Sequence, residues 1–157
     1  MDKKIWNRLL AIILIICMLP WMELNTAYIY ALEETALSNM VVSGNITLTE
    51  HQQVQDLIVN TGATLNLNGY TLAVEGSVIC DGKLAVNNGT LMCSQDMTVS
   101  DNGIVQMNGA SDFIYVKGNL LWNSNIGTKE YMTNGRLELG GNFTVVRENG
   151  FATADMH

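Results

Sequence analysis

Pairs of Asn or Asp followed by Gly recur between residues 62 and 150 and constrain the fold more than any other feature of this sequence. The pairs are Asn68-Gly69, Asp81-Gly82, Asn88-Gly89, Asn102-Gly103, Asn108-Gly109, Asn134-Gly135 and Asn149-Gly150. Asn and Gly tolerate the positive φ angles of tight turns, so each pair indicates a change of chain direction. The intervening segments, such as TLNL, TLAV and FIYV, are too short for helices and alternate apolar with polar residues. The pattern predicts an all-β chain of short strands.

Similar glycine-led units recur along this region, and the recurrence bears on how the strands pair. The segments that start at Gly76, Gly89 and Gly103 follow one another at a near-constant spacing. Asn-Gly pairs between strands are typical of antiparallel hairpins, so an antiparallel β-sandwich is the alternative. Internal repetition instead favours a parallel β-helix, or β-solenoid, in which each coil gives one strand to each of two or three sheets. Coils of about 20 residues would give roughly five coils between Val54 and Gly150.

The N-terminal residues have the pattern of an export signal. Three basic residues precede the uncharged run of residues 9–22, which is shorter than the roughly 18 residues expected of a membrane span. We expect residues 1–31 to be a secretory signal helix that is cleaved after Ala31, because signal peptidase needs small residues near the cut. The protein would then be secreted or held at the cell surface. The alternative is an uncleaved N-terminal anchor that extends through Tyr30.

The remaining chain divides into a linker and a repeat region. Residues 32–44 have mixed composition and predict a linker, whereas residues 45–157 predict the β-solenoid. The last residues, FATADMH, look like the opening of a further coil that is truncated. Because a solenoid end presents unpaired strand edges, we expect self-association through an uncapped C-terminal end.

The charge of the chain argues against nucleic acid as a partner. The chain has 15 acidic and 8 basic residues and a formal net charge of -7. A protein that binds nucleic acid clusters Lys and Arg to neutralise phosphates. After residue 31 the basic residues are spread along the repeats as Lys83, Lys117, Lys129, Arg136 and Arg147. We expect these side chains to be solvated at turns.

Two cysteines follow the predicted signal. Cys80 and Cys93 lie in matched surroundings, GSVICDGKLAV and GTLMCSQDMTV. Since an exported protein can keep a disulfide, a bond between these two residues is one interpretation. The other is that both are small apolar residues buried on strands. Sequence spacing alone does not establish the Cα separation of about 4.4–6.8 Å that a disulfide needs.

The residue pattern of the repeats resembles that of a known group of proteins. The blocks TLNLNGYTLAVEGSV, GIVQMNGASDFIYVKGNLLW and NGRLELGGNFTV look like the repetitive Gly/Asn-rich N-terminal regions of Rhs-type and adhesin-like exported bacterial surface proteins. Those regions are predicted to fold as right-handed parallel β-helices. The resemblance covers roughly residues 45–154 and rests on residues that shape a fold; none matches a catalytic position. It implies a secreted or wall-exposed scaffold, stalk or adhesin-like region.

The sequence shows no catalytic or metal-binding pattern. Nucleophilic catalysis needs a well-held imidazole, but His51 lies in a polar run and His157 is terminal. Two distant histidines and two separated cysteines give no recognised zinc-ligand spacing. A polysaccharide lyase or hydrolase needs converging carboxylates, whereas Asp residues here lie at or near turns. We therefore expect no enzymatic activity, no cofactor and no metal.

Aromatic residues offer the remaining binding chemistry, because rings exposed on a flat sheet can stack on sugars. In the C-terminal third they are Phe113, Tyr115, Trp122, Tyr131 and Phe143. The polar segment NSNIGTKE separates Trp122 from Tyr131, so we expect these two rings to be exposed and to stack on a glycan. The leading expectation is a non-catalytic, exported β-solenoid scaffold or adhesin-like module with a surface glycan or protein as its partner. A carbohydrate-binding or polysaccharide-active β-helix protein is the alternative.

Overall fold

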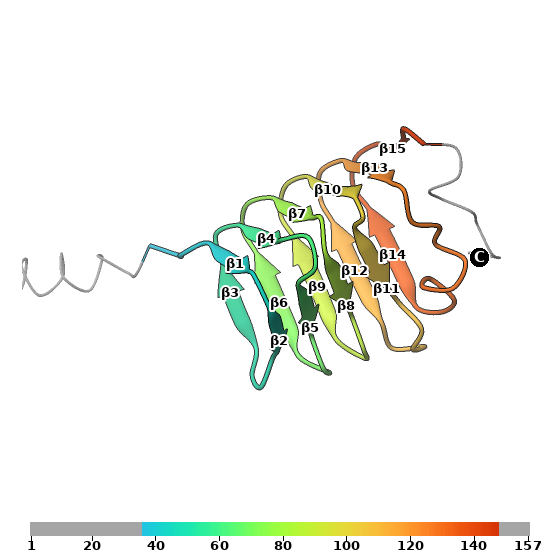
Figure 1. Cartoon of the computed structure of the whole chain (residues 1–157). Helices are drawn as coiled ribbons and strands as arrows, with labels where there is room; N and C mark the ends of the chain where they lie inside the picture. The colour runs from blue at the N-terminus through green and yellow to red at the C-terminus, as the bar shows by residue number, and fades with distance from the viewer. Residues whose placement is uncertain (1–35, 148–157) are drawn as a thin grey trace, which may run out of the picture. The chain divides into compact units, whose positions relative to one another are not determined.

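The computed structural model describes residues 36–147 (Figure 1). The signal helix predicted at residues 1–31 and the further coil predicted for the last residues lie outside the described residues. Within residues 36–147, no helix is long and apolar enough to cross a bilayer. This part of the chain is all-β.

Short β-strands form the regular structure of the described residues. They are β1 (Met40–Val42), β2 (Asn45–Thr47), β3 (Gln52–Val54), β4 (Leu57–Val59), β5 (Thr64–Asn66), β6 (Thr71–Val74), β7 (Val78–Cys80), β8 (Lys83–Ala85), β9 (Thr90–Cys93), β10 (Met97–Asp101), β11 (Ile104–Gln106), β12 (Phe113–Val116), β13 (Leu120–Ser124), β14 (Arg136–Leu139) and β15 (Phe143–Val145). Sheet A has the order β1-β4-β7-β10-β13-β15, sheet B the order β11-β8-β5-β2, and sheet C the order β14-β12-β9-β6-β3. The coils contribute strands to sheets A, B and C in turn, except that the coil that begins with β13 gives none to sheet B.

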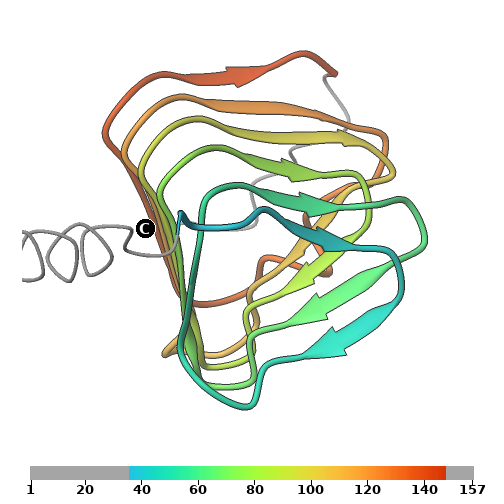
Figure 2. The same ribbon diagram turned by 90° about the vertical axis from the view of Figure 1, so that its left-hand side faces the viewer.

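Every pairing between these strands is parallel, and the chain forms a β-solenoid of about five turns. Figure 2 shows the coils stacked with their three sides in line. The expected parallel β-solenoid is therefore confirmed, and the antiparallel β-sandwich is wrong. The physical reason is that each strand pairs with the strand about one coil later, not with its neighbour in sequence.

The core lies inside the coils and consists of columns of aliphatic side chains. In sheet C the inward positions of β6, β9 and β12 are Leu72, Leu91 and Ile114, each 0% exposed. Residues on either side of each inward position point outward, as the alternation in the sequence predicts. Burial of each such side chain contributes roughly 1.5–3 kcal/mol, so the columns hold the stack together.

The near-constant glycine spacing has a different origin from the one expected. Gly76 precedes β7 of sheet A, Gly89 precedes β9 of sheet C, and Gly103 precedes β11 of sheet B. The spacing therefore relates different sides of the solenoid. Residues one coil apart are instead Gly82 and Gly103, because Lys83 pairs with Ile104. Successive strands of sheet A lie 17 to 23 residues apart in the sequence, which agrees with the expected coil of about 20 residues.

We name the turns after the sheets that they join, so that the AB corner leads from sheet A to sheet B. Positive φ angles occur at the BC corner at Asn68 (50°) and Asn88 (62°), as their Asn-Gly pairs predict, and also at Asn87 (45°). At the AB corner Gly62 (78°) and Asp101 (48°) also have positive φ angles, but Gly103 is required for another reason. A Cβ atom at Gly103 would lie 2.1 Å from the carbonyl oxygen of Cys80, so the close approach of two coils excludes a side chain there.

The first and the last coil depart from the expected boundaries and regularity. Strand β1 lies within residues 32–44, which were predicted to be a linker. In the coil that begins with β13, sheet B receives no strand; an irregular segment leads to β14, and a single parallel bridge joins Met107 to Met132. Sheet B is thus the shortest of the three sheets, and its outer face ends at β11.

Candidate functional site

Side chains at the CA corner link successive coils by hydrogen bonds. Asp56 Oδ1 accepts from the backbone N–H of Ser77 at 2.9 Å, and Asp96 Oδ1 accepts from the N–H of Asn119 at 2.6 Å. Asn119 Oδ1 in turn accepts from the N–H of Asn142 at 3.0 Å. These residues form a column that lies one position before the strands of sheet A. Because each acceptor satisfies a backbone donor of the following coil, the column stabilises the stack.

The AB corner carries a second polar column. Asn60 Nδ2 donates to Ser43 Oγ at 2.9 Å, and the Ser100 hydroxyl donates to Asp81 Oδ1. Both bonds join residues of neighbouring coils. The Asp81 carboxylate is therefore committed to an inter-coil contact.

Asp112 is a buried acid at the BC corner, with 1% of its surface exposed. Its Oδ1 accepts from the backbone N–H of Asn88 at 2.5 Å, and its Oδ2 accepts from the N–H groups of Asn108 (2.7 Å) and Gly109 (2.8 Å). Three backbone donors thus replace the water that this carboxylate loses on burial. The bond to Asn88 ties the corner of one coil to that of the preceding coil.

The aspartates of the corners do not converge on one catalytic centre. Asp81 and Asp112 lie at different corners, whereas Asp56 and Asp96 share one column with Ser77 between them. Each accepts a hydrogen bond from a neighbouring coil. Within the part of the chain that the structure describes, no three His, Cys, Asp or Glu side chains cluster as metal ligands would.

His51 is exposed, but its ring has defined contacts. Its Nδ1 accepts from the backbone N–H of Thr71 at 3.0 Å, and the ring meets Tyr70 edge to face with centroids 5.5 Å apart. The imidazole therefore joins the first two coils on the side of sheet C. This contact joins residues one coil apart, so it could not be predicted from the local sequence around His51.

Cys80 and Cys93 are both free and buried, so the disulfide interpretation is wrong and the alternative is confirmed. Cys80 ends β7 in sheet A, whereas Cys93 ends β9 in sheet C. Their thiols instead point to backbone carbonyls; Cys80 Sγ lies 3.4 Å from Gly82 O, and Cys93 Sγ lies 3.6 Å from Gly76 O. Desolvation raises the pKa of the Cys80 thiol to about 12 and also raises the pKa of Cys93.

The two predicted glycan-stacking rings do not share an exposed face. Trp122 is 2% exposed and stands in a core column beside Val99, so the expectation of an exposed ring there is wrong. Its inward position follows from its alternation with Leu120 along β13. Tyr131 is half-buried; its backbone carbonyl accepts from the N–H of Met107 at 2.7 Å. A stacking role for Tyr131 stays a prediction.

The outer face of sheet C instead presents Phe113 and Tyr115, both half-buried. The guanidinium of Arg136 lies 4.3 Å from the centroid of the Phe113 ring and forms an ion pair with Glu138 at 3.1 Å. Phe113 and Tyr115 were not predicted to face outward. Their orientation could have been predicted, because they alternate with the buried Ile114 and Val116 along β12. Because Arg136 covers one ring, the patch is partly closed by its own neighbour.

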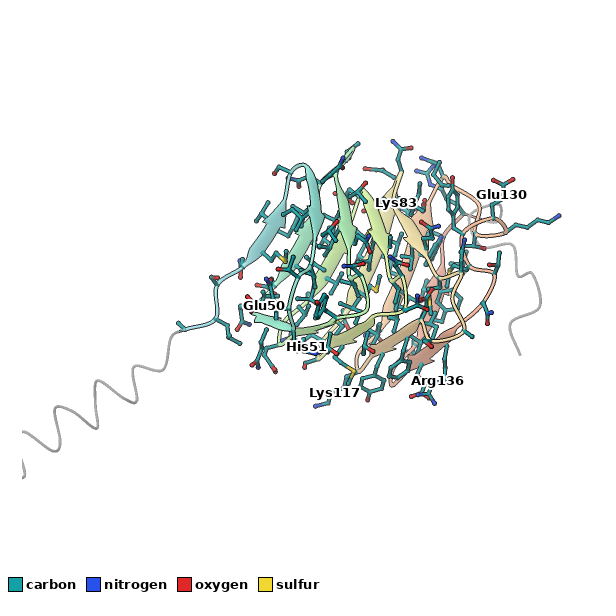
Figure 3. The ribbon with its side chains drawn as sticks, turned by 90° about the horizontal axis from the view of Figure 1, so that it is seen from below. Glu50, His51, Lys83, Lys117, Glu130 and Arg136 are labelled. Atoms are coloured by element: carbon teal, nitrogen blue, oxygen red, sulfur yellow. The ribbon has the colours of Figure 1, made fainter. Side chains whose placement is uncertain are left out.

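A groove of about 350 Å³ lies over sheet B. Its lining residues are Thr64, Asn66, Lys83, Ala85, Asn87, Asn88, Gln106, Asn108, Gly109 and Asp112. They come from β5, β8 and β11 and from the BC corners that follow β8 and β11. Figure 3 shows Lys83 on the opposite side of the view from Lys117 and Arg136, so the groove and the aromatic patch face different directions.

Comparison with known proteins gives no counterpart for this chain: no family model, no curated protein and no solved structure matches it. The resemblance to Rhs-type and adhesin-like surface proteins thus gains no support from a relative. The parallel β-solenoid itself is shown by the strand pairing.

Proposed function

We propose that the protein is an exported, non-enzymatic β-solenoid that serves as a scaffold or adhesin-like module at the cell surface. The observation that carries this proposal is the use of the corner aspartates. Asp56, Asp81, Asp96 and Asp112 each accept a hydrogen bond that joins two coils. Acid groups that stabilise a stack are not free to act as a catalytic pair, and the part of the molecule described here has the character of a rigid, repetitive support.

Export rests on the N-terminal pattern of basic residues followed by a short apolar run. The test is expression of the full chain in a bacterial host, followed by fractionation and mass spectrometry of the N-terminus. We expect the protein in the envelope or the medium, with Leu32 as its first residue. A cytosolic protein with an intact N-terminus would refute export, and an envelope protein that retains Met1 would support the anchored alternative.

The absence of catalysis is tested separately on the same purified protein. Incubation with soluble neutral and acidic polysaccharides should release neither reducing ends nor unsaturated products. Turnover that disappears in an Asp81→Asn or Asp96→Asn variant would establish the polysaccharide-active alternative and overturn this part of the proposal.

Carbohydrate binding without catalysis is the second candidate function. The groove over sheet B favours it, because amide and hydroxyl side chains gather there in a concave surface.

A further inference from the structure

The groove over sheet B has a floor and a wall, and the stacking of the coils determines the position of both. The floor is the outer face of β5, β8 and β11, where Asn66, Ala85 and Gln106 occupy one column in three successive coils. Ala85 lies between two longer amide side chains, so the floor is lowest at its methyl group. The wall is the BC corner, where Asn87 and Asn88 adopt positive φ angles of 45° and 62°. The cavity is thus a built feature of three coils.

Several polar groups in the groove remain available for a ligand. Thr64, Lys83, Asn88 and Gln106 form no side-chain hydrogen bond or ion pair with any residue between 36 and 147. Asn66 uses only its Oδ1, which accepts from the N–H of Asn68 at 2.9 Å and from Asn87 Nδ2 at 3.3 Å. The aspartates of the corners, in contrast, are committed to neighbouring coils. Unused donors and acceptors in a concave surface are the usual means of holding a polar ligand.

The charge and the backbone of the groove narrow the class of ligand. Lys83 contributes one ammonium group, and the carboxylate of Asp112 is buried against three backbone donors. Carboxamides and a hydroxyl therefore dominate the accessible polar lining, and a polyanion would find one cation only. The floor is the face of a paired sheet, so its backbone cannot add a peptide strand.

We infer that this groove binds a short, linear, uncharged oligosaccharide that lies along the stacking direction across three coils. Carboxamides both donate and accept, so they suit the hydroxyl groups of a sugar, and the Ala85 methyl and the Lys83 stem offer apolar surface to its ring. Adjacent strands are about 4.8 Å apart, so the floor spans roughly 10 Å from β5 to β11. The inference rests on the proposed function as a surface interaction module and names the ligand of that module.

The experiment places a larger side chain on the floor of the groove. Ala85→Gln extends the Asn66–Gln106 column into the cavity at an outward, half-buried position, and Gln106→Ala removes one unused carboxamide. The matched control is Ala73→Gln, which makes the same change at an outward, half-buried position of sheet C. The full-length protein is tested on an array of neutral gluco-, xylo-, manno- and chito-oligosaccharides with uronate oligosaccharides beside them, and the array ligands are then titrated by calorimetry.

We expect the wild type and Ala73→Gln to bind a neutral oligosaccharide with equal affinity. Ala85→Gln should weaken binding by about tenfold or more, because its longer side chain occupies the space of the ligand, and Gln106→Ala should weaken it by roughly threefold to tenfold, because it removes hydrogen bonds to the ligand. Far-UV circular dichroism checks that both variants keep the fold. Absence of binding to any neutral oligosaccharide, binding to uronates alone, or equal binding by Ala85→Gln would overturn the inference. Export and surface location are measured independently, so those outcomes would leave the proposed function standing.

Discussion

Replacement of Asp112 should destabilise the solenoid more than replacement of any other corner aspartate. The side chain is 1% exposed and accepts three backbone hydrogen bonds, at 2.5, 2.7 and 2.8 Å. A hydrogen bond to a charged group contributes roughly 1.5–3 kcal/mol. Asn88 and Asn108 are exposed, so water reaches part of this corner, and we take the lower value for each bond. Asp112→Ala should then lower the free energy of unfolding by about 4.5 kcal/mol.

Two further variants make the measurement specific. Asp112→Asn keeps one acceptor oxygen and should cost about 2 kcal/mol, roughly half as much. Asp96→Ala is the control, because Asp96 is exposed and, among residues 36–147, its carboxylate accepts hydrogen bonds from Asn119 alone; it should cost about 1 kcal/mol. Urea unfolding followed by circular dichroism gives the free energy from the midpoint and the slope. If Asp112→Ala costs no more than Asp96→Ala, the assigned role of the three backbone bonds is refuted.

Three other predictions follow from the packing. Gly103→Ala should cost roughly 2–4 kcal/mol in the same unfolding assay, because its Cβ would meet the Cys80 carbonyl oxygen at 2.1 Å; Gly44→Ala, in the same column but with nothing within 4 Å, should stay within about 0.5 kcal/mol of wild type, and equal losses would contradict the steric argument. Burial raises the pKa of Cys80 from 9.0 to about 12, so its stabilising contribution is complete below pH 9 and is lost as the pH rises toward 12. The stability difference between wild type and Cys80→Ala should fall in that window, and a pH-independent difference would refute the assignment. Val145 is 40% exposed at the end of sheet A, so Val145→Glu should abolish the concentration-dependent association that we expect in light scattering; a monomeric wild type would remove this expectation.

The sequence predicts the parallel solenoid because local alternation and repetition agree. Leu65 and Leu84 each stand between outward polar or small residues, and the coil of about 20 residues brings them into one column. The same alternation would also have placed Trp122 in the core with Leu120. The polar segment that follows Trp122 suggested an exposed ring, but the alternation along its own strand decides its position.

The groove could not be predicted from the sequence, and the reason is physical. It requires Asn66, Ala85 and Gln106 to align across three coils, yet the coils differ in length. An alignment that is one residue out would turn these outward side chains into the core. The cysteines show the same effect, since equal surroundings placed them on different sheets and not on facing positions.

The register of the sheets has a consequence for the way in which the chain reaches its folded form. Each strand of sheet A pairs with a partner only 17 to 23 residues further along the sequence. The chain leaves a ribosome or a translocation channel with its N-terminus first. Each newly emerged strand can therefore pair with a strand of the preceding coil that has already folded. Folding can advance one turn at a time behind the exit, and the long stretch of chain still inside is not needed for any contact made so far.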